Sequence, residues 1–280
     1  MPRIPKDAAL KPKKPNPRAP KAPPGALRIL ISNDDGIDAP GIYELVQQAK
    51  RIGDVIVVAP LGQQSAVGHA ITMNQPLRVK EFQKDGKFFG YAVEGTPADC
   101  VKLALRSLLD YTPDLILSGI NHGSNTAVNI MYSGTVSAAT EGTIMGIPSV
   151  ALSLTTYGEP DFRFAAKFSA KLAKLVMQKG LPRGVLLNVN IPAVPEREIK
   201  GVRVTRQGKT QWNDTFEVRR DPINRQFYWL TGSLDVVDTS DDTDHVSVEK
   251  NYISITPIQY DLTDYPMIKK MKAWGVEKLI

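Results

Sequence analysis

Residues 28–36 read Arg28-Ile29-Leu30-Ile31-Ser32-Asn33-Asp34-Asp35-Gly36, an aliphatic run followed by two adjacent carboxylates and a glycine. A short apolar run that ends at a turn signal predicts a buried strand. Open α/β sheets bind their ligands at the carboxyl ends of the strands, where Asp34 and Asp35 lie. Adjacent carboxylates repel each other unless a cation or a raised pKa relieves them. Because Asp-Gly is also a common turn dipeptide, the stretch by itself fits either a site or a solvated turn.

Length and cysteine content narrow the class of protein. The 280 residues suffice for one large domain, or for one domain with an appendage. The single cysteine, Cys100, excludes an intramolecular disulfide framework and a cysteine-rich zinc site. The sequence shows no apolar run of about 20 residues and no N-terminal signal core. We therefore expect a cytoplasmic protein without a membrane partner.

The positive charge of the chain lies at its N-terminus. Of the 35 Lys/Arg and 29 Asp/Glu residues, seven basic and one acidic residue fall within 1–27, so this segment accounts for the net charge of +6. It also holds eight of the 21 prolines, and this composition predicts a disordered tail. The neutral remainder gives no reason to expect nucleic-acid binding. A nucleotide- or RNA-associated protein that acts through the basic tail is the alternative function.

Residues 28–192 alternate between strand-like and helix-like apolar patterns. The expected strands are 28–31, 55–58, 115–117, 150–154 and 185–189, and a hairpin is expected over 77–93. The expected helices are 42–52, 96–109, 161–179 and one that begins near 135. Strand–helix–strand repetition predicts an α/β fold, a Rossmann-like, doubly wound and mainly parallel sheet.

The pattern changes near residue 192. Short strands are expected at 202–204, 227–230 and 252–255 without helices between them, and a last helix at 265–279. We therefore divide the chain into a tail (1–27), an α/β catalytic domain (28–192) and a β-rich arm with a C-terminal helix (193–280). Aromatic residues of the arm could stack on a base or fill an interface; they are Trp212, Tyr228 and Trp229.

Polar residues follow several of the predicted parallel strands. Asp34 and Asp35 end the first, Ser65 lies in the loop after the second, and Asn121 follows a later one. The topology places these ends side by side. Carboxylate, hydroxyl and amide oxygens are hard ligands, which suit Mg²⁺, Mn²⁺ or Ca²⁺.

The turn Ser133-Gly134-Thr135 opens a predicted helix and resembles an anion site, although it could also be a plain helix cap. A cation site beside an anion site indicates phosphoryl chemistry. His122 could be a base, a ligand or a hydrogen-bonding scaffold. The sequence has no P-loop, no dinucleotide-binding glycine fingerprint and no nucleophile elbow, which argues against three large enzyme classes.

Several motifs, in one order, resemble the SurE family, the stationary-phase survival proteins that act as metal-dependent 5′-nucleotidases. The first is Ile31-Ser32-Asn33-Asp34-Asp35-Gly36-Ile37-Asp38-Ala39-Pro40-Gly41-Ile42. Others follow at 58–60 with Ser65 beyond, 95–101, 118–125, 132–136 and 252–257. The resemblance covers about residues 28–262. The Pro/Lys tail departs from the family pattern, and the loop 61–65 lacks the basic residues expected there.

The resemblance implies a SurE-like fold and hydrolysis of nucleoside 5′-monophosphates, and sometimes of 3′-nucleotides or short polyphosphate. It implies one divalent cation per subunit, Mg²⁺ or Mn²⁺, and a homodimer or homotetramer that exchanges its C-terminal arms. The implied metal ligands are Asp34, Asp35, Ser65 and Asn121, of which Asp34 and Asp35 would also be catalytic. The implied substrate and phosphate contacts are Asn33, Gly123, Asn125, Ser133, Gly134 and Thr135.

Overall fold

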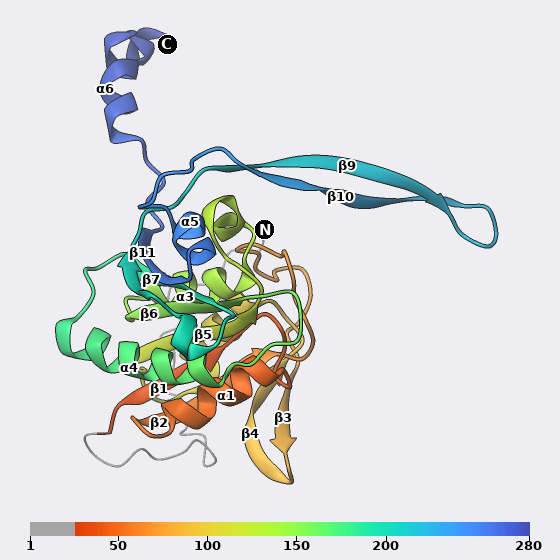
Figure 1. The fold of residues 1–280 in the computed structure, drawn as a ribbon, viewed down its shortest axis with the longest axis vertical. Coiled ribbons are helices and arrows are strands. Elements are labelled where there is room, and N and C mark those ends of the chain that lie inside the picture. Colours follow the sequence, from red (N-terminus) through yellow and green to blue (C-terminus); the bar gives the residue numbers. More distant parts are fainter. Residues whose placement is uncertain (1–25) are drawn as a thin grey trace.

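The fold is a central sheet covered by helices on both faces, with a hairpin and a C-terminal helix that extend away from it (Figure 1). The structure is a computed structural model and describes residues 26–280. The predicted tail lies outside the described residues, apart from its last two. Within the described part, no helix has the length and apolar character needed to cross a membrane.

The sheet has nine strands in the order β3-β4-β2-β1-β5-β6-β7-β11-β8. Neighbours from β4 to β7 run parallel, whereas β3 and β11 run antiparallel to β4 and β7. This confirms the predicted mainly parallel, doubly wound sheet. The strands are β1 (Arg28–Ser32), β2 (Asp54–Pro60), β3 (Val79–Lys84), β4 (Lys87–Val93), β5 (Leu115–His122), β6 (Ser149–Thr155), β7 (Val185–Pro192), β8 (Gly201–Val204) and β11 (Tyr252–Gln259).

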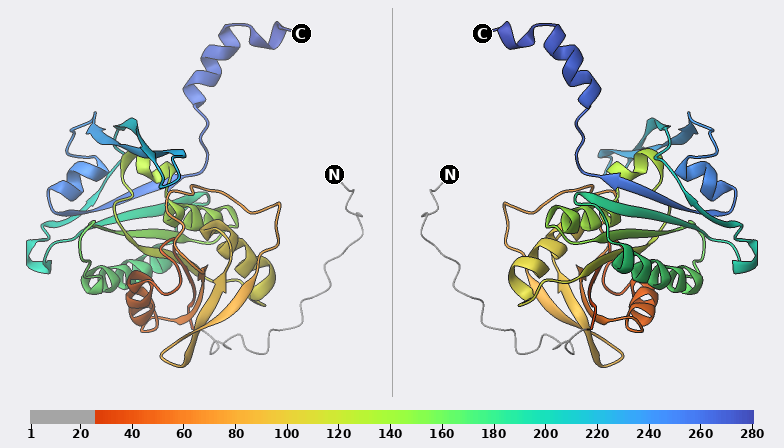
Figure 2. Two further views of the ribbon diagram at one scale, coloured as in Figure 1. Left: turned by 90° about the vertical axis from the view of Figure 1, so that its right-hand side faces the viewer. Right: turned by 90° about the vertical axis from the view of Figure 1, so that its left-hand side faces the viewer.

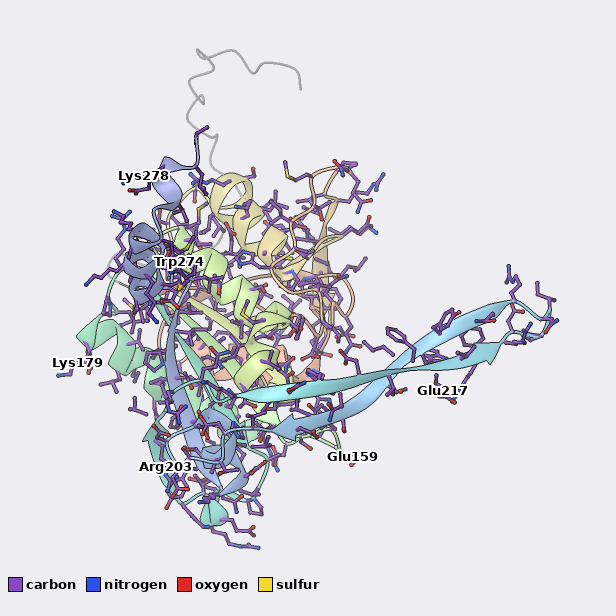
Figure 3. All side chains as sticks on the ribbon, turned by 90° about the horizontal axis from the view of Figure 1, so that it is seen from above. Glu159, Lys179, Arg203, Glu217, Trp274 and Lys278 are labelled. Carbon is purple, nitrogen blue, oxygen red and sulfur yellow. The ribbon has the colours of Figure 1, made fainter. Side chains whose placement is uncertain are left out.

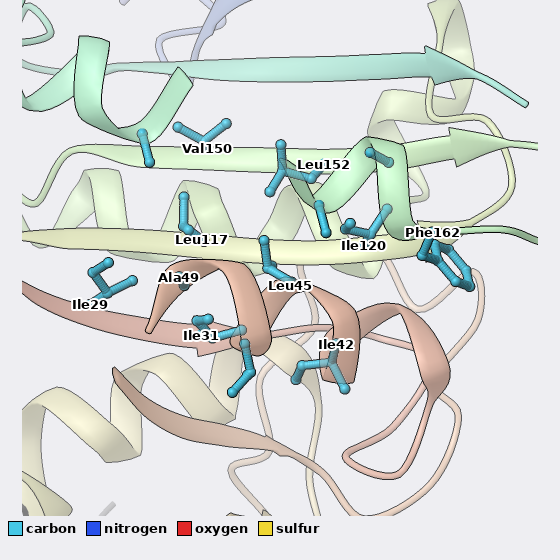
Figure 4. Close-up of a cluster of buried hydrophobic side chains, with 14 of the residues drawn as sticks. Ile29, Ile31, Ile42, Leu45, Ala49, Leu117, Ile120, Val150, Leu152 and Phe162 are labelled. Carbon is cyan, nitrogen blue, oxygen red and sulfur yellow. The ribbon is translucent and has the colours of Figure 1, made fainter. Parts of the chain in front are cut away.

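The centre of strand β1, Ile29-Leu30-Ile31, is apolar on both sides because helices bury both faces of the strand. Ile29 and Ile31 pack in the cluster that includes α1 (Pro40–Ala49) and α4 (Arg163–Lys179), part of which is drawn in Figure 4. Leu30 faces the other way, into the cluster that includes α2 (Pro97–Leu103) and Ala138 of α3 (Gly134–Ile144). The opening run of the sequence therefore lies at the centre of the sheet, with a core on each side.

Three helix predictions need correction. The helix expected over 96–109 is α-helical only to Leu103 and then widens into a π-helical turn, Ala104–Leu108. The last helix, α6 (Tyr265–Ala273), stops early because Gly275 adopts a left-handed conformation with φ +73°, and a short 3₁₀ turn follows. The expectation of no helix among the late strands is wrong, since α5 (Asp244–Glu249) precedes β11.

The region after residue 192 is partly continuous with the main sheet. Strands β8 and β11 extend it beyond β7, with Ile255 of β11 opposite Val189. The segments that leave the body are the antiparallel hairpin β9 (Thr210–Arg220) with β10 (Gln226–Val236), and helix α6. The hairpin extends far from the body, and its side chains lie in solvent (Figure 3). Helix α6 is separated from the body by a short linker (Figure 2).

Candidate active site

The carboxylate of Asp34 is buried at the end of β1 and is held by the first turn of α3. The Thr135 backbone N–H donates to Asp34 Oδ2 at 3.0 Å, and the Thr135 hydroxyl donates to Oδ1. Gly134 permits this approach, because a Cβ there would lie 2.8 Å from the Asp34 Cβ. The sequence predicts that Thr135 contacts phosphate, but in the structure both of its donors serve Asp34.

The turn after Asp35 is built by two neighbours. Gly36 has φ +98°, and a Cβ there would lie 3.1 Å from the backbone of Gly62. The Asn33 side-chain amide donates to the Gly36 carbonyl at 2.8 Å and fixes the turn. Asn33 is fully buried and does not line the pocket described below, so the structure does not bring this predicted substrate contact to the site.

Asp35 is only partly buried and points toward the end of β5. Its Oδ2 accepts the backbone N–H of His122 at 3.0 Å. The His122 ring is 2.9 Å, measured from Nε2, from the Gly158 carbonyl oxygen, so it also ties down the loop after β6. His122 thus makes the contacts of a hydrogen-bonding scaffold, one of the roles that the sequence left open, and it also lines the pocket described below.

Both carboxylates have raised pKa values. Burial raises the pKa of Asp34 to about 6, and the charge of Asp35 adds to the rise against the opposing hydrogen bonds from Thr135. Burial likewise raises the pKa of Asp35, opposed by the hydrogen bond from His122. Two adjacent acids that both resist ionisation define a place where a cation would be stabilised.

A pocket of about 710 Å³ collects most of the predicted site residues. Its size is that of a small-molecule site. From β1, β5 and the loops and turn around them it takes Asp34, Asp35, Ser65, Asn121, Gly123, Asn125 and Ser133. Gly134 and Thr135 lie directly behind this wall and shape it through Asp34. The four predicted metal ligands, which come from three separate segments, therefore share one pocket.

Asn121 and Asn125 are oriented by the backbone around them. The Asn121 amide nitrogen donates to the Gly123 carbonyl at 2.9 Å, which leaves its Oδ1 as the outward acceptor. Asn125 is buried and fixed by β7, since its N–H donates to Asn190 Oδ1 at 2.8 Å and its carbonyl accepts Asn188 Nδ2 at 2.7 Å. The loop after β5 is thus held rigidly at the carboxyl edge of the sheet.

The β9–β10 hairpin forms one wall of the pocket, and Trp212 was the only sign of this wall in the sequence. Trp212 lines the pocket and donates its indole N–H to Asn129 Oδ1 at 3.0 Å. Tyr132 and Tyr157 line it from the loops after β5 and β6. Of the three aromatic residues considered for the arm, only Trp212 reaches the pocket. The sequence gave no site role to Tyr157, Asn129 or Tyr132. Tyr132 and Tyr157 are exposed, and Asn129 lies in a five-residue 3₁₀ helix, so none of them stands out by a periodic pattern.

The donor set fits a hard divalent cation. No three His, Cys, Asp or Glu side chains gather as a metal cluster anywhere in 26–280, so a cation here would also need the hydroxyl of Ser65 and the amide oxygen of Asn121. Within the same range, no Lys or Arg lines the pocket to neutralise Asp34 and Asp35. Two carboxylates with neutral oxygens are the ligands that Mg²⁺ and Mn²⁺ accept.

These features define a doubly wound α/β protein with an acidic, oxygen-lined pocket at the carboxyl edge of its sheet. The family model "Survival protein SurE" matches residues 29–214. The "5′-nucleotidase SurE" of Chlorobaculum tepidum is 47% identical over 257 residues, covering 92% of this chain and 98% of the relative. That of Chlorobium chlorochromatii is 50% identical over 250 residues, covering 89% and 92%.

The solved structure of the SurE protein from Aquifex aeolicus is also similar. It is 42% identical, has a TM-score of 0.77 and covers 89% of this chain and 99% of its own. The chain belongs to the SurE family, as its motifs predicted.

Proposed function

We propose that the chain is a divalent-metal-dependent 5′-nucleotidase, which hydrolyses nucleoside 5′-monophosphates to a nucleoside and phosphate. The observation that carries the proposal is the meeting of Asp34 and Asp35 with Ser65 and Asn121 in one pocket beside the N-terminus of α3. The names of the relatives, 5′-nucleotidase SurE, support the same activity.

One Mg²⁺ or Mn²⁺ ion per subunit would be held by Asp34, Asp35, Ser65 and Asn121. A bound cation would polarise a water molecule and offset the charge that develops on the phosphoryl group. The chain prepares this site by holding Asp34 rigidly through Thr135 and Asp35 through the His122 backbone. These contacts fix two carboxylates in place before a ligand arrives, which lowers the cost of binding.

The phosphate would lie against the first turn of α3. In that turn, the Thr135 N–H serves Asp34 and the Val136 N–H donates to Ser133 Oγ at 3.1 Å. That leaves the Gly134 N–H, which lies just behind the pocket wall, and the helix dipole to favour an anion at this end of the pocket. Gly123 and Asn125 line the same pocket and complete the polar end.

The nucleoside would extend toward the aromatic wall. Tyr132, Tyr157 and Trp212 offer flat surfaces on which a base can stack, and the Asn129 hydrogen bond fixes the Trp212 indole. Stacking of this kind tolerates different bases, so we expect activity on several nucleoside monophosphates.

The test is release of phosphate from AMP by the full chain, with and without EDTA and with Mn²⁺ or Mg²⁺ added back. Asp34→Ala should abolish turnover. The matched control is Asp38→Ala, because Asp38 lies in the same segment but is exposed and pairs with Lys84 at 2.8 Å. Turnover that survives EDTA, or that survives in Asp34→Ala, would contradict the proposal. Assays with 3′-AMP and short polyphosphate test whether the chain also hydrolyses these substrates.

We also propose that the chain assembles with itself, as a homodimer or homotetramer that exchanges C-terminal arms. Support comes from apolar side chains that the single chain leaves exposed, such as Trp229 on the hairpin and Trp274 beside α6. Helix α6 buries none of its residues. Light scattering should give a multiple of the 30.7 kDa chain mass, and removal of residues 263–280 should reduce it. A full-length chain that is monomeric would refute this.

A further inference from the structure

One face of the β9–β10 hairpin borders the active-site pocket. Trp212 and Asp214 of β9 both line the pocket, whereas Asn213 between them does not. Side chains alternate between the two faces of a strand, so Trp212 and Asp214 lie on the same face, the one turned toward the pocket. Leu230 of β10 also lines the pocket, and it pairs in register with Phe216 on β9. The Asp214 carboxylate therefore belongs to the hairpin wall of the pocket and has apolar neighbours.

The Asp214 carboxylate is open to a ligand. It is exposed, and within residues 26–280 its side chain makes no hydrogen bond and no ion pair. Its partner in register is Gly232, which also lines the pocket and has no side chain to cover it. Asp235, by contrast, lies on the opposite face of β10 and accepts a hydrogen bond from the Asn213 side-chain amide. Asp214 thus offers free acceptor oxygens to a molecule in the pocket.

The charges of the pocket disfavour a second phosphate group beside Asp214. In the proposed function, the bound cation lies at the sheet end of the pocket, with Asp34 and Asp35. Within the described part of the chain, no Lys or Arg lines the pocket to offset the charge of Asp214. Like charges repel, so an anionic group next to this carboxylate would be destabilised. The hairpin wall therefore suits neutral groups that donate hydrogen bonds.

The ribose of a nucleotide carries two neutral donors side by side, the 2′- and 3′-hydroxyls. The two oxygens of one carboxylate can accept both, and dinucleotide-binding folds use an acidic residue on the ribose hydroxyls in a similar way. Trp212, on the same face as Asp214, offers the base a surface for stacking, and the ribose lies between the base and the phosphate. Because all ribonucleotides share these hydroxyls, the contact is compatible with activity on several bases.

We propose that Asp214 is a specificity-determining residue, which accepts hydrogen bonds from the free 2′- and 3′-hydroxyls of a ribonucleoside 5′-monophosphate. The proposal rests on the proposed function, because the 5′-phosphate must lie near Asp34 and Asp35 for the ribose to reach the hairpin. A site built to bind hydroxyls discriminates against a substrate that lacks them. Asp214 also discriminates, through its charge, against a substrate that carries a 3′-phosphate in addition.

The test measures kcat/KM of the full chain for AMP, for 2′,3′-dideoxy-AMP and for purine riboside 5′-monophosphate, which lacks the amino group of adenine. We expect the wild type to prefer AMP to the dideoxy analogue about tenfold, mainly through KM, and Asp214→Ala to lose this preference. Asp214→Asn keeps one acceptor oxygen and should retain part of it. The matched control is Asp235→Ala, on the other face of the hairpin, which should keep the full preference.

Adenosine 3′,5′-bisphosphate adds a readout that a purely structural role of Asp214 would not produce. Asp214→Asn removes the charge that repels the 3′-phosphate. The variant should therefore raise kcat/KM for release of the 5′-phosphate several-fold relative to that for AMP, with 3′-AMP identified as the product by chromatography. An unchanged ratio would overturn the charge-based part of the proposal.

Three results would overturn the contact with ribose: an equal preference for AMP over the dideoxy analogue in wild type and Asp214→Ala, an equal loss for all substrates in that variant, or a change confined to the preference for AMP over purine riboside 5′-monophosphate, which would place Asp214 at the base. If AMP itself is not hydrolysed, the proposed function is wrong, and calorimetric titration with Mn²⁺ present still tests the contact. In that case the wild type should bind AMP more tightly than the dideoxy analogue, and equal affinities would refute the role of Asp214.

Discussion

The carboxyl edge of the sheet and the β9–β10 hairpin use apolar residues in opposite ways. In β1, Leu30 is fully buried and helices cover both faces of the strand. In β10, Leu230 is 62% exposed and Trp229 is 56% exposed, on a two-stranded ribbon without a core. A two-stranded hairpin alone is marginally stable in water. The single chain thus positions the edge of the sheet, whereas the exposed apolar residues of the hairpin are suited to contact with a partner.

This contrast also divides the pocket. Its reactive end is rigid because Asp34, Asp35 and Asn125 are each tied to a neighbouring element. Its far wall, with Trp212 and Asp214, belongs to the hairpin. We therefore expect chemistry to depend on the sheet, and substrate selection to depend on the hairpin.

The largest expected effect comes from a substitution at the reactive end of the pocket, which carries Asp34 and Asp35. Asp34→Asn keeps the shape of the side chain and a hydrogen bond with Thr135, but it removes a charge from the cation site. We expect turnover of AMP to fall roughly 10³-fold. Asp214→Asn, a matched change on the hairpin side, should cost less than about tenfold, mostly in KM. Equal losses in steady-state kinetics would remove the proposed division of the pocket.

Two leucine-to-alanine substitutions, one in the sheet and one in the hairpin, compare how much each region contributes to stability. Leu30→Ala opens a cavity between the sheet and the helices α2 and α3, so we expect the free energy of unfolding to fall by about 2–5 kcal/mol. Leu230→Ala, on the exposed ribbon, should change it by less than about 0.5 kcal/mol. Urea denaturation followed by circular dichroism gives both values. A large loss for Leu230→Ala would show that the hairpin contributes to the core in solution.

The pH dependence of stability tests the burial of Asp34. Its folded pKa of about 6 exceeds the ordinary aspartate value of 3.8, so the folded state binds the proton more tightly than the unfolded chain does. The contribution is full below about pH 4 and is lost as pH rises through about 6. It amounts to on the order of 2–3 kcal/mol.

Metal-free protein should therefore gain stability from pH 8 to pH 5 through this group, and Asp34→Asn should lose that dependence. Denaturation in EDTA at several pH values measures it. Added Mn²⁺ should restore stability at high pH, because it binds the ionised form. If the wild type and the Asp34→Asn variant had the same pH profile, burial of Asp34 would not be the source of the dependence.

A smaller effect concerns the loop that carries Ser65. His69, in this loop, contacts Glu141 of α3 over 3.1 Å, and Lys102 contacts the same carboxylate over 2.5 Å. His69→Ala should loosen the loop and weaken Mn²⁺ binding by several-fold, while kcat at saturating metal stays near that of the wild type. Metal titration of turnover separates the two quantities. A lower kcat with unchanged metal affinity would assign His69 a different role.

Removal of the N-terminal segment is expected to leave turnover unchanged. A chain that lacks residues 1–25 keeps every residue that lines the pocket. Its turnover of AMP should equal that of the full chain in the same assay. A loss of activity would revive the alternative in which the basic tail carries the function.

Local sequence was most informative for segments whose own apolar pattern is enough to determine their secondary structure. The strand at Arg28–Ser32 and the helix at 163–179 follow directly from apolar periodicity. The end of α6 was missed because the expected helix ran through Gly275, whose left-handed conformation stops it. The short helix α5 was missed because its six residues are too few for a periodic signal.

For the site, the sequence alone determined the ingredients. Asp34-Asp35 after an apolar run, the asparagine after a later strand and the Ser-Gly-Thr turn are all readable because each is a contiguous motif. Only the tertiary structure decided that Thr135 serves Asp34 and that Asn33 fixes a turn. Only the structure joined Trp212 to Asn129. The contacts of Thr135 with Asp34 and of Trp212 with Asn129 join segments up to 101 residues apart, and no local pattern encodes such distances.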